Sequence, residues 1–319
     1  MLRILAAALA ALAFVLAHPV QASCGTAFCT VNTNWSAHGA WTERGARFDL
    51  RFEYMDQDQP QSGTQKVAVG QIPSHHDEVR TINRNWVASF DYGFNNNWGV
   101  TVALPVVNRS HEHIHNHMGA QLPETWNFTQ AGDLRVLGRY QFAPVQQGGG
   151  SSQSGLNFGL KLPTGAFDVQ NADGDAAERT LQPGSGTTDA LLGAYHQRSL
   201  PQQDWSMFVQ AIAQLPLNTR EEFRPGNRLS LDVGLRYEAT DKLGLLLQTN
   251  LLWRGRDTGA EAETDDSGGT SLWLSPGVAY AIGKDWQAYA FLQQSLYQYV
   301  NGVQLVAERG VVIGVSGRF

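Results

Sequence analysis

Residues 229–238 read LSLDVGLRYE, and this stretch decides the fold class. Apolar and polar side chains alternate along it without a break, with Leu229, Leu231, Val233, Leu235 and Tyr237 set against Ser230, Asp232, Gly234, Arg236 and Glu238. Because successive side chains of a β-strand point to opposite faces, a period of two predicts a strand and excludes an amphipathic helix. This strand therefore has one apolar face and one charged face.

The same alternation recurs along the chain, clearly over residues 47–54, 133–140 and 156–162. The predicted strands are 44–56, 85–95, 98–107, 131–143, 155–164, 188–199, 205–217, 228–239, 242–254, 270–282, 286–299 and 309–319. The strands near 188 and 286 alternate poorly, so the count could differ by two. The pattern predicts an all-β transmembrane antiparallel up-and-down β-barrel of about 12 strands, within the even-numbered range of outer-membrane barrels.

The connections between the predicted strands alternate between short turns and long polar segments. Short turns fall at 95–97, 201–204, 240–242 and 283–285, and long loops at 57–84, 108–130, 165–187, 218–227, 255–269 and 300–308. Outer-membrane barrels have short periplasmic turns and longer extracellular loops. Trp98, Trp205 and Trp286 each follow a short turn, as in a periplasmic aromatic girdle. The alternative, core tryptophans of a soluble sandwich, does not explain their shared position.

The two ends of the chain carry export and assembly signals. Residues 1–22 contain Arg3, an apolar run from Ile4 to Ala17 and a small-residue site ending at Ala22, which predicts a cleaved signal peptide. The last segment, GVVIGVSGRF, is amphipathic and ends on Phe319. It resembles the signal read by the barrel-assembly machinery, which we expect as a partner alongside outer-membrane lipid. The predicted location is the outer membrane of a Gram-negative bacterium.

The only two cysteines, Cys24 and Cys29, lie just after the predicted cleavage site. Export to an oxidising compartment favours a disulfide between them. A lipid on Cys24 is disfavoured because Gln21 stands where an aliphatic residue is expected. Residues 23–43 precede the predicted barrel at 44–319, and this segment either inserts as a plug or tethers the periplasmic foot.

The charged strand faces are expected to line the lumen, because Lys or Arg on the lipid face costs roughly 2–4 kcal/mol at the bilayer midplane. The predicted lumen residues are Arg47, Asp49, Arg51, Glu53, Asp133, Arg135, Arg139, Asp232, Arg236 and Glu238. They form either a conduction lining or a neutralising ion-pair lattice. Barrels of about 8 strands are filled by side chains and those of 16–18 are open, so twelve strands are compatible with a narrow pore.

Three stretches resemble a known family: FTQAGDLRVLGRYQF (128–142), GLKLPTG (159–165) and LQPGSGTTDALLGAYHQ (181–197). They are similar to the outer-membrane transporters associated with the meta-pathway of phenol degradation, whose members carry comparable Gly-Asp-Leu and Pro-Gly-Ser/Thr-Gly strand edges. The resemblance covers about the second two thirds of the chain. It implies a barrel that passes small, often aromatic or hydrophobic molecules. The region before residue 128 departs from the family pattern.

Histidines cluster in two of the predicted outer loops. His111, His113, His115 and His117 alternate in HEHIHNHM, and His75 and His76 lie in the preceding long loop. In an extended segment, residues two apart project to one face with Cα atoms about 7 Å apart. Neutral imidazoles bind Zn, Cu or Ni near pH 7, so the sequence predicts a divalent transition-metal site. The alternatives are a polar histidine-rich loop and a pH-responsive gate.

The predicted function is an outer-membrane channel for small solutes with a metal-binding outer loop, whose cargo is a small molecule or a metal ion. One alternative is an uptake channel for aromatic or hydrophobic compounds without a metal role. A surface enzyme is disfavoured because His196 is the only histidine within a predicted strand, and His76-Asp77-Glu78 only weakly resembles a barrel protease. The net charge of -6 gives no basic surface for nucleic acid.

Overall fold

The computed structural model describes residues 31–33, 44–72, 76–117, 120–200 and 204–319. Their strands are β1 (Gly45–Gln57), β2 (Gln59–Gly63), β3 (Gln65–Lys66), β4 (His76–Gly93), β5 (Trp98–His117), β6 (Ala120–Ala131), β7 (Leu134–Gln141), β8 (Val145–Gln147), β9 (Gly150–Leu162), β10 (Asp189–Leu200), β11 (Trp205–Pro216), β12 (Arg228–Glu238), β13 (Leu243–Arg254), β14 (Gly269–Ile282), β15 (Trp286–Val306) and β16 (Arg309–Arg318). No helix among these residues has both the length and the apolar character needed to cross a membrane.

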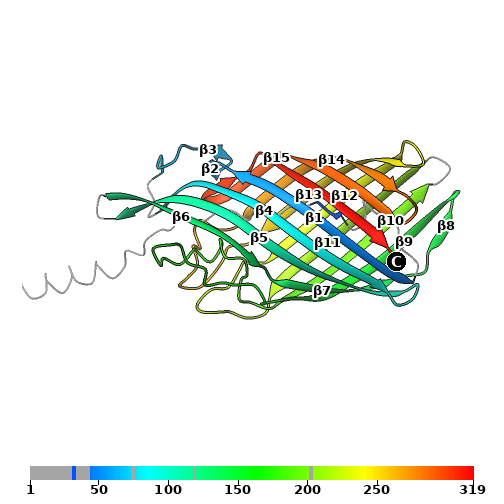
Figure 1. The fold of residues 1–319 in the computed structure, drawn as a ribbon, viewed down its shortest axis with the longest axis horizontal. Helices are drawn as coiled ribbons and strands as arrows, with labels where there is room; N and C mark the ends of the chain where they lie inside the picture. The colour runs from blue at the N-terminus through cyan, green and yellow to red at the C-terminus, as the bar shows by residue number, and fades with distance from the viewer. Residues whose placement is uncertain (1–30, 34–43, 73–75, 118–119, 201–203) are drawn as a thin grey trace, which may run out of the picture.

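Twelve of these strands form a closed antiparallel barrel, which confirms the predicted fold class and strand count. Their order around the barrel is β1, β4, β5, β7, β9, β10, β11, β12, β13, β14, β15 and β16. Pairing of β1 with β16, from Arg47 opposite Arg318 to Met55 opposite Gly310, closes the sheet on itself. Figure 1 shows the tilted wall, with the C-terminus at one end and β2, β3 and the tip of β6 at the other. Closure leaves the wall without an unpaired edge.

The two faces of the wall are inverted relative to a soluble protein. On β12, Leu229 and Val233 are each 47% exposed on the outside, whereas Asp232 is 6% exposed on the inside. Bonds between non-adjacent strands cross the interior, such as Tyr289 Oη to Asp49 Oδ2 at 2.7 Å from β15 to β1. An apolar outer face around a polar interior is the arrangement of an outer-membrane barrel.

Aromatic side chains gather near the end of the wall that holds the C-terminus. Trp98, Trp205 and Trp286 begin β5, β11 and β15 and are exposed. The ring of Trp286 lies 5.7 Å from that of Phe319, the last residue of the chain. This end is therefore the periplasmic end, and the opposite end opens to the cell exterior.

At the outer end, β4, β5 and β6 extend beyond the lipid-facing band. The outward positions of β4 change from Trp86, Ala88 and Phe90 to Arg84 and Arg80, and those of β5 change from Leu104 and Val106 to Asn108, Ser110 and Glu112. The expectation that 57–84 and 108–130 form long loops is therefore wrong for much of their length. These residues pair instead, with His111 opposite Thr81 on β4 and Trp126 on β6.

The described residues before the barrel lie inside it. Val31 packs in a buried apolar cluster with Leu246, Ala279, Tyr289, Phe291 and Val312. The backbone of Asn32 makes two bonds with Gln248, N to Oε1 at 3.1 Å and O to Nε2 at 2.9 Å. Residues 31–33 thus occupy part of the lumen. Cys24, Cys29 and the predicted domain boundary at residue 43 lie outside the described residues.

Candidate functional site

The segment between β9 and β10, residues 163–188, folds into the outer mouth and is held there by Asp133. The carboxylate of Asp133 accepts bonds from Lys161 Nζ at 2.9 Å, Gly165 N at 3.1 Å, and Ser185 N and Oγ, both at 3.0 Å. Asp133 lies in the break between β6 and β7, where its side chain can reach both ends of the loop. We refer to residues 163–188 as the inner loop and to Asp133 as its anchor.

Glycines permit the close packing at this anchor. A Cβ on Gly184 would lie 2.5 Å from the backbone oxygen of Gly165, and one on Gly165 would lie 2.7 Å from backbone of Gly132. The three residues belong to the Gly-Asp-Leu, Pro-Thr-Gly and Pro-Gly-Ser-Gly stretches that resemble the family. These stretches therefore meet in space as one junction that docks the inner loop.

Arg179 of the inner loop forms a constriction between two phenyl rings. Its guanidinium carbon lies 4.9 Å from the centroid of Phe167 and 5.0 Å from that of Phe223, within cation–π range. Arg179, Thr180, Gln182 and Phe223 line a cavity above and another below. We call the upper cavity the vestibule and the lower one the lumen cavity.

The vestibule has a volume of about 640 Å³ and a predominantly acidic lining. Its charged residues are Asp168, Glu178, Glu221, Glu222, Glu261 and Glu263 against Arg179, with His76 at one side. A set of like charges around one cavity attracts cations into it.

A histidine cluster, comprising His76, His111, His113 and His115, lies on the inward face of β4 and β5 beside the vestibule. His111 and His113 are 2% and 1% exposed. His111 Nε2 lies 3.2 Å from His113 Nδ1, and the rings of His76 and His113 stack with centroids 4.4 Å apart. The β4–β5 pairing creates the cluster, since His76 is opposite His115.

Carboxylates complete this cluster. Glu178 Oε1 of the inner loop lies 3.3 Å from His76 Nδ1 and 3.7 Å from His113 Nδ1. Glu78 Oε2 of β4 lies 3.8 Å from His111 Nε2. Two groups with ligand atoms all within 4.8 Å of one another result, namely His76, His113 and Glu178, and Glu78, His111 and His113.

Outer contacts orient the imidazoles. Thr81 Oγ1 bonds Nδ1 of His111 at 2.9 Å, so the Nε2 atom of that ring faces the cluster. Glu124 of β6 bonds Nε2 of His113 at 2.9 Å, which turns the Nδ1 atom inward. Burial lowers the pKa of both histidines, well below the usual range for His111, where His113 and Arg109 add to the effect. Both rings are therefore neutral at pH 7 and can act as ligands.

Glu263, from the segment between β13 and β14, adds a further buried acid. Burial, together with the nearby charges of Glu178 and Glu78, raises its pKa well above the usual range. A side-chain hydrogen bond with Glu178 adds to this effect, so the two carboxyl groups lie close together. Two buried acids this close are costly unless a proton or a cation neutralises them.

The structure brings only some of the six predicted metal ligands together. It brings together His76, His111 and His113, and places His115 on their edge through Glu124 at 3.2 Å. His117 lies exposed at the end of β5, outside both groups, and His75 lies outside the described residues. Glu78, Glu124, Glu178 and Glu263 are absent from the ligands predicted from the sequence. Only Glu78 had a local signal, because it lies two residues after His76 on one strand face.

The predicted lumen residues all lie on inward-facing positions. Those on β1, β7 and β12 alternate inward, and Asp133 precedes β7. Part of the set is paired, for example Arg51 Nε with Glu53 Oε1 at 2.7 Å, and Arg47 Nη2 with Asp91 Oδ2 at 4.0 Å. The lumen cavity lies between them, with a volume of about 310 Å³.

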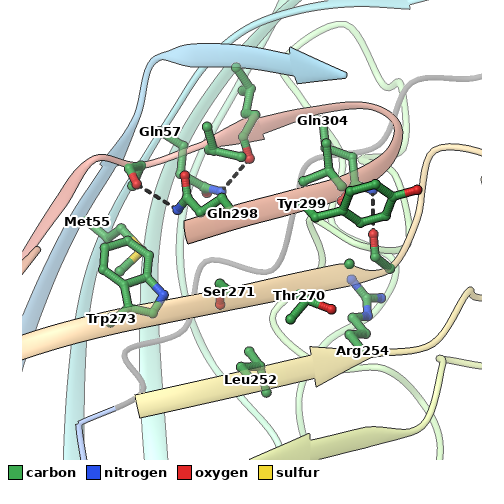
Figure 2. A pocket seen from close by; sticks show the side chains of 16 residues that line it. Met55, Gln57, Leu252, Arg254, Thr270, Ser271, Trp273, Gln298, Tyr299 and Gln304 are labelled. Carbon is green, nitrogen blue, oxygen red and sulfur yellow. Dashed lines mark hydrogen bonds between the residues drawn. The ribbon is translucent and has the colours of Figure 1, made fainter. Parts of the chain in front are cut away.

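A smaller pocket of about 60 Å³ lies between the outer ends of β1, β14 and β15 (Figure 2). Three glutamine amides there donate to backbone carbonyls: Gln57 to Leu305 at 3.0 Å, Gln298 to Ala307 at 2.8 Å and Gln304 to Gly268 at 2.9 Å. These bonds satisfy the backbone where β15 turns back on itself. The pocket therefore has a structural explanation.

One protein family and several solved structures are similar to this chain. The family described as "Putative MetA-pathway of phenol degradation" matches residues 57–304. An outer-membrane channel from Pseudomonas putida F1 superposes with a TM-score of 0.66 at 12% identity, over 91% of this chain and 100% of that one. The NanC porin has a TM-score of 0.45 at 12% identity, over 85% and 100% of the two chains. No curated protein sequence matches the chain.

Proposed function

Because the chain belongs to the MetA-pathway phenol-degradation family, we propose that this outer-membrane barrel is a channel for small solutes that binds a divalent transition metal at its outer mouth. The observation that carries the metal proposal is the convergence of His76, His111 and His113 with Glu78 and Glu178. These donors come from two strands and from the inner loop.

Each of the two groups contains one pair of donors at the spacing that a bound ion requires. Two nitrogens bound at 2.0–2.1 Å to a tetrahedral Zn²⁺ are about 3.3 Å apart. The separations of 3.2 Å from His111 Nε2 to His113 Nδ1, and of 3.3 Å from His76 Nδ1 to Glu178 Oε1, are close to this value. His113 belongs to both groups, so it is the shared ligand of either arrangement.

The surroundings also support an ion. Carboxylates that hold the far nitrogen of a ligating imidazole are typical of metal sites, and Glu124 does this for His113. A divalent cation would neutralise the buried carboxylate of Glu178. The mixture of imidazole and carboxylate donors suits Zn, Cu or Ni better than the hard ions Ca and Mg.

Calorimetric titration of the refolded barrel with Zn²⁺ and Cu²⁺ tests the metal site. We expect one high-affinity site in the wild type and a loss of at least about 100-fold in His113→Ala, because removing even an outer contact of a ligand costs 10–100-fold. His117→Ala is the matched control, since it removes the same side chain from the same strand outside both groups. Both variants should keep the heat-modifiable gel shift of a folded barrel. Equal metal affinity in wild type and His113→Ala would refute the site.

A further inference from the structure

The lumen cavity has two chemically different walls. Apolar side chains line one side, namely Val87, Ala103, Pro105 and Val107 of β4 and β5. The flanking and facing strands carry charged groups, from β1 beside β4, from β7 beside β5, and from β9, β12 and β13, together with Phe223 above. Six basic side chains line the cavity against four acidic ones: Arg51, Arg135, Lys161, Arg179, Arg228 and Arg254 against Glu53, Asp133, Asp189 and Asp232.

Most of these charges form pairs. Lys161 Nζ lies 2.9 Å from Asp133 and 3.2 Å from Asp189, and Arg254 pairs with Asp257 just above the cavity. Arg51 pairs with Glu53. These ion pairs form a neutralising lattice, one of the two arrangements considered from the sequence.

Arg135 differs from these residues. Among the described residues no carboxylate oxygen lies within 4.0 Å of its guanidinium, and its Nη2 donates to the neutral Gln214 Oε1 of β11 at 3.0 Å. Gln214 in turn donates to Asp189 at 2.6 Å. The amide of Gln214 thus occupies one arm of the Arg135 fork, and a carboxylate would be a stronger acceptor for it.

We propose that the lumen cavity binds a small organic monoanion, with its carboxylate on Arg135 and its apolar body against Val87, Ala103 and Val107. This inference rests on the proposed channel function and adds a substrate class to it. A volume of about 310 Å³ is at the small end of ligand pockets, which suits a molecule of about one ring. The apolar wall excludes water from one side and strengthens the attraction between guanidinium and carboxylate.

Current blocking in planar bilayers tests the proposal with benzoate as the probe and benzamide as its neutral isostere. We expect benzoate to reduce the KCl current at a concentration at least about 10-fold lower than benzamide does, which corresponds to 1.4 kcal/mol. Arg135→Gln should remove this preference. Arg236→Gln is the matched control, because it loses the same charge from the lumen wall near the periplasmic mouth, where Arg236 bonds Glu238.

The possible results separate the two proposals. Equal block by benzoate and benzamide, or an unchanged preference in Arg135→Gln, would overturn the anion site while leaving the channel in place. A folded barrel without KCl current would overturn the channel. Calorimetry of benzoate binding to the barrel in detergent would then decide the anion site, with binding by the wild type and not by Arg135→Gln as the supporting result.

Discussion

Replacing the anchor carboxylate, Asp133→Asn, should release the inner loop without unfolding the barrel. Asn has the same shape but keeps one acceptor oxygen and introduces an NH₂ group. In the wild type, Oδ2 accepts from Lys161 and Ser185 while Oδ1 accepts from Gly165 N. One of these two acceptor positions is therefore lost, together with the negative charge.

The size of the effect follows from the bonds removed. Hydrogen bonds to a charged group contribute about 1.5–3 kcal/mol each. Between one and three of the four bonds lose their acceptor atom, and all four lose the negative charge. Lys161 retains Asp189 at 3.2 Å, which offsets part of the cost. We expect docking of the inner loop to weaken by about 3–5 kcal/mol, a shift of roughly 10²- to 5 × 10³-fold in its equilibrium.

Two assays report this release. On intact cells, external protease should cut the inner loop faster in Asp133→Asn than in wild type. Single-channel recordings of the variant should show larger and noisier currents. Asp91→Asn is the matched control, because Asp91 is a lumen carboxylate that accepts from Thr101 within the wall and does not contact the inner loop. Wild-type protease resistance and wild-type current in Asp133→Asn would refute the anchoring role.

Three further predictions concern the chain ends and the vestibule. Deleting Phe319 should lower the heat-modifiable fraction in the outer membrane but not export, since its backbone pairs with Ala46 and its ring contacts Trp286; normal assembly would contradict this. Cys24 and Cys29 should appear as a disulfide in unreduced mass spectra, and two free thiols or a lipid on Cys24 would count against it. With a chelator present, vestibule loop 255–268 should lose hydrogen-exchange protection, corrected for intrinsic rates, as pH rises from about 5 to 8. Burial raises the pKa of Asp266 to about 6 and that of Glu263 well above the usual range, so the docked loop favours the protonated forms of both acids. Proton binding therefore stabilises the docked loop at low pH, and this stabilisation is lost as the pH rises through the raised pKa values. Protection that stays constant or increases with pH would contradict it.

The barrel wall was predictable from sequence because the bilayer imposes a period of two. Leu229 and Val233 must face lipid while Asp232 faces the lumen, because the reverse arrangement would place a charged side chain in hydrocarbon at a large cost in free energy. Above the membrane this constraint disappears. Asn108 and Ser110 face outward and Arg109 and His111 face inward, so both faces are polar and the alternation of hydrophobicity vanishes although the strand continues. Polarity then predicts a loop where pairing forms a strand.

The candidate metal site was predictable only in part. The spacing of His111 and His113 places both rings on one face, and the structure brings His76 to them across the β4–β5 pair. Glu178 and Glu263 approach the histidine cluster from segments far along the chain, and no local sequence pattern predicts that contact. Their position depends on the docking of the inner loop, which the glycine and Asp133 motifs determine through close backbone packing. The sequence identifies these motifs as family features but does not reveal that they dock the inner loop.

The order of charges along the barrel axis links the two proposed sites. An anion entering from outside meets the acidic vestibule before it reaches Arg135, so the unliganded vestibule opposes its entry. A divalent ion on His76, His113 and Glu178 would add two positive charges there, next to Arg179 of the constriction. Metal occupancy should therefore favour anion passage, and by linkage a bound anion should favour the metal. We expect Zn²⁺ to lower the benzoate concentration that blocks the current and a chelator to reverse this effect. His113→Ala should abolish the zinc effect, whereas a zinc effect that persists in this variant would separate the two sites.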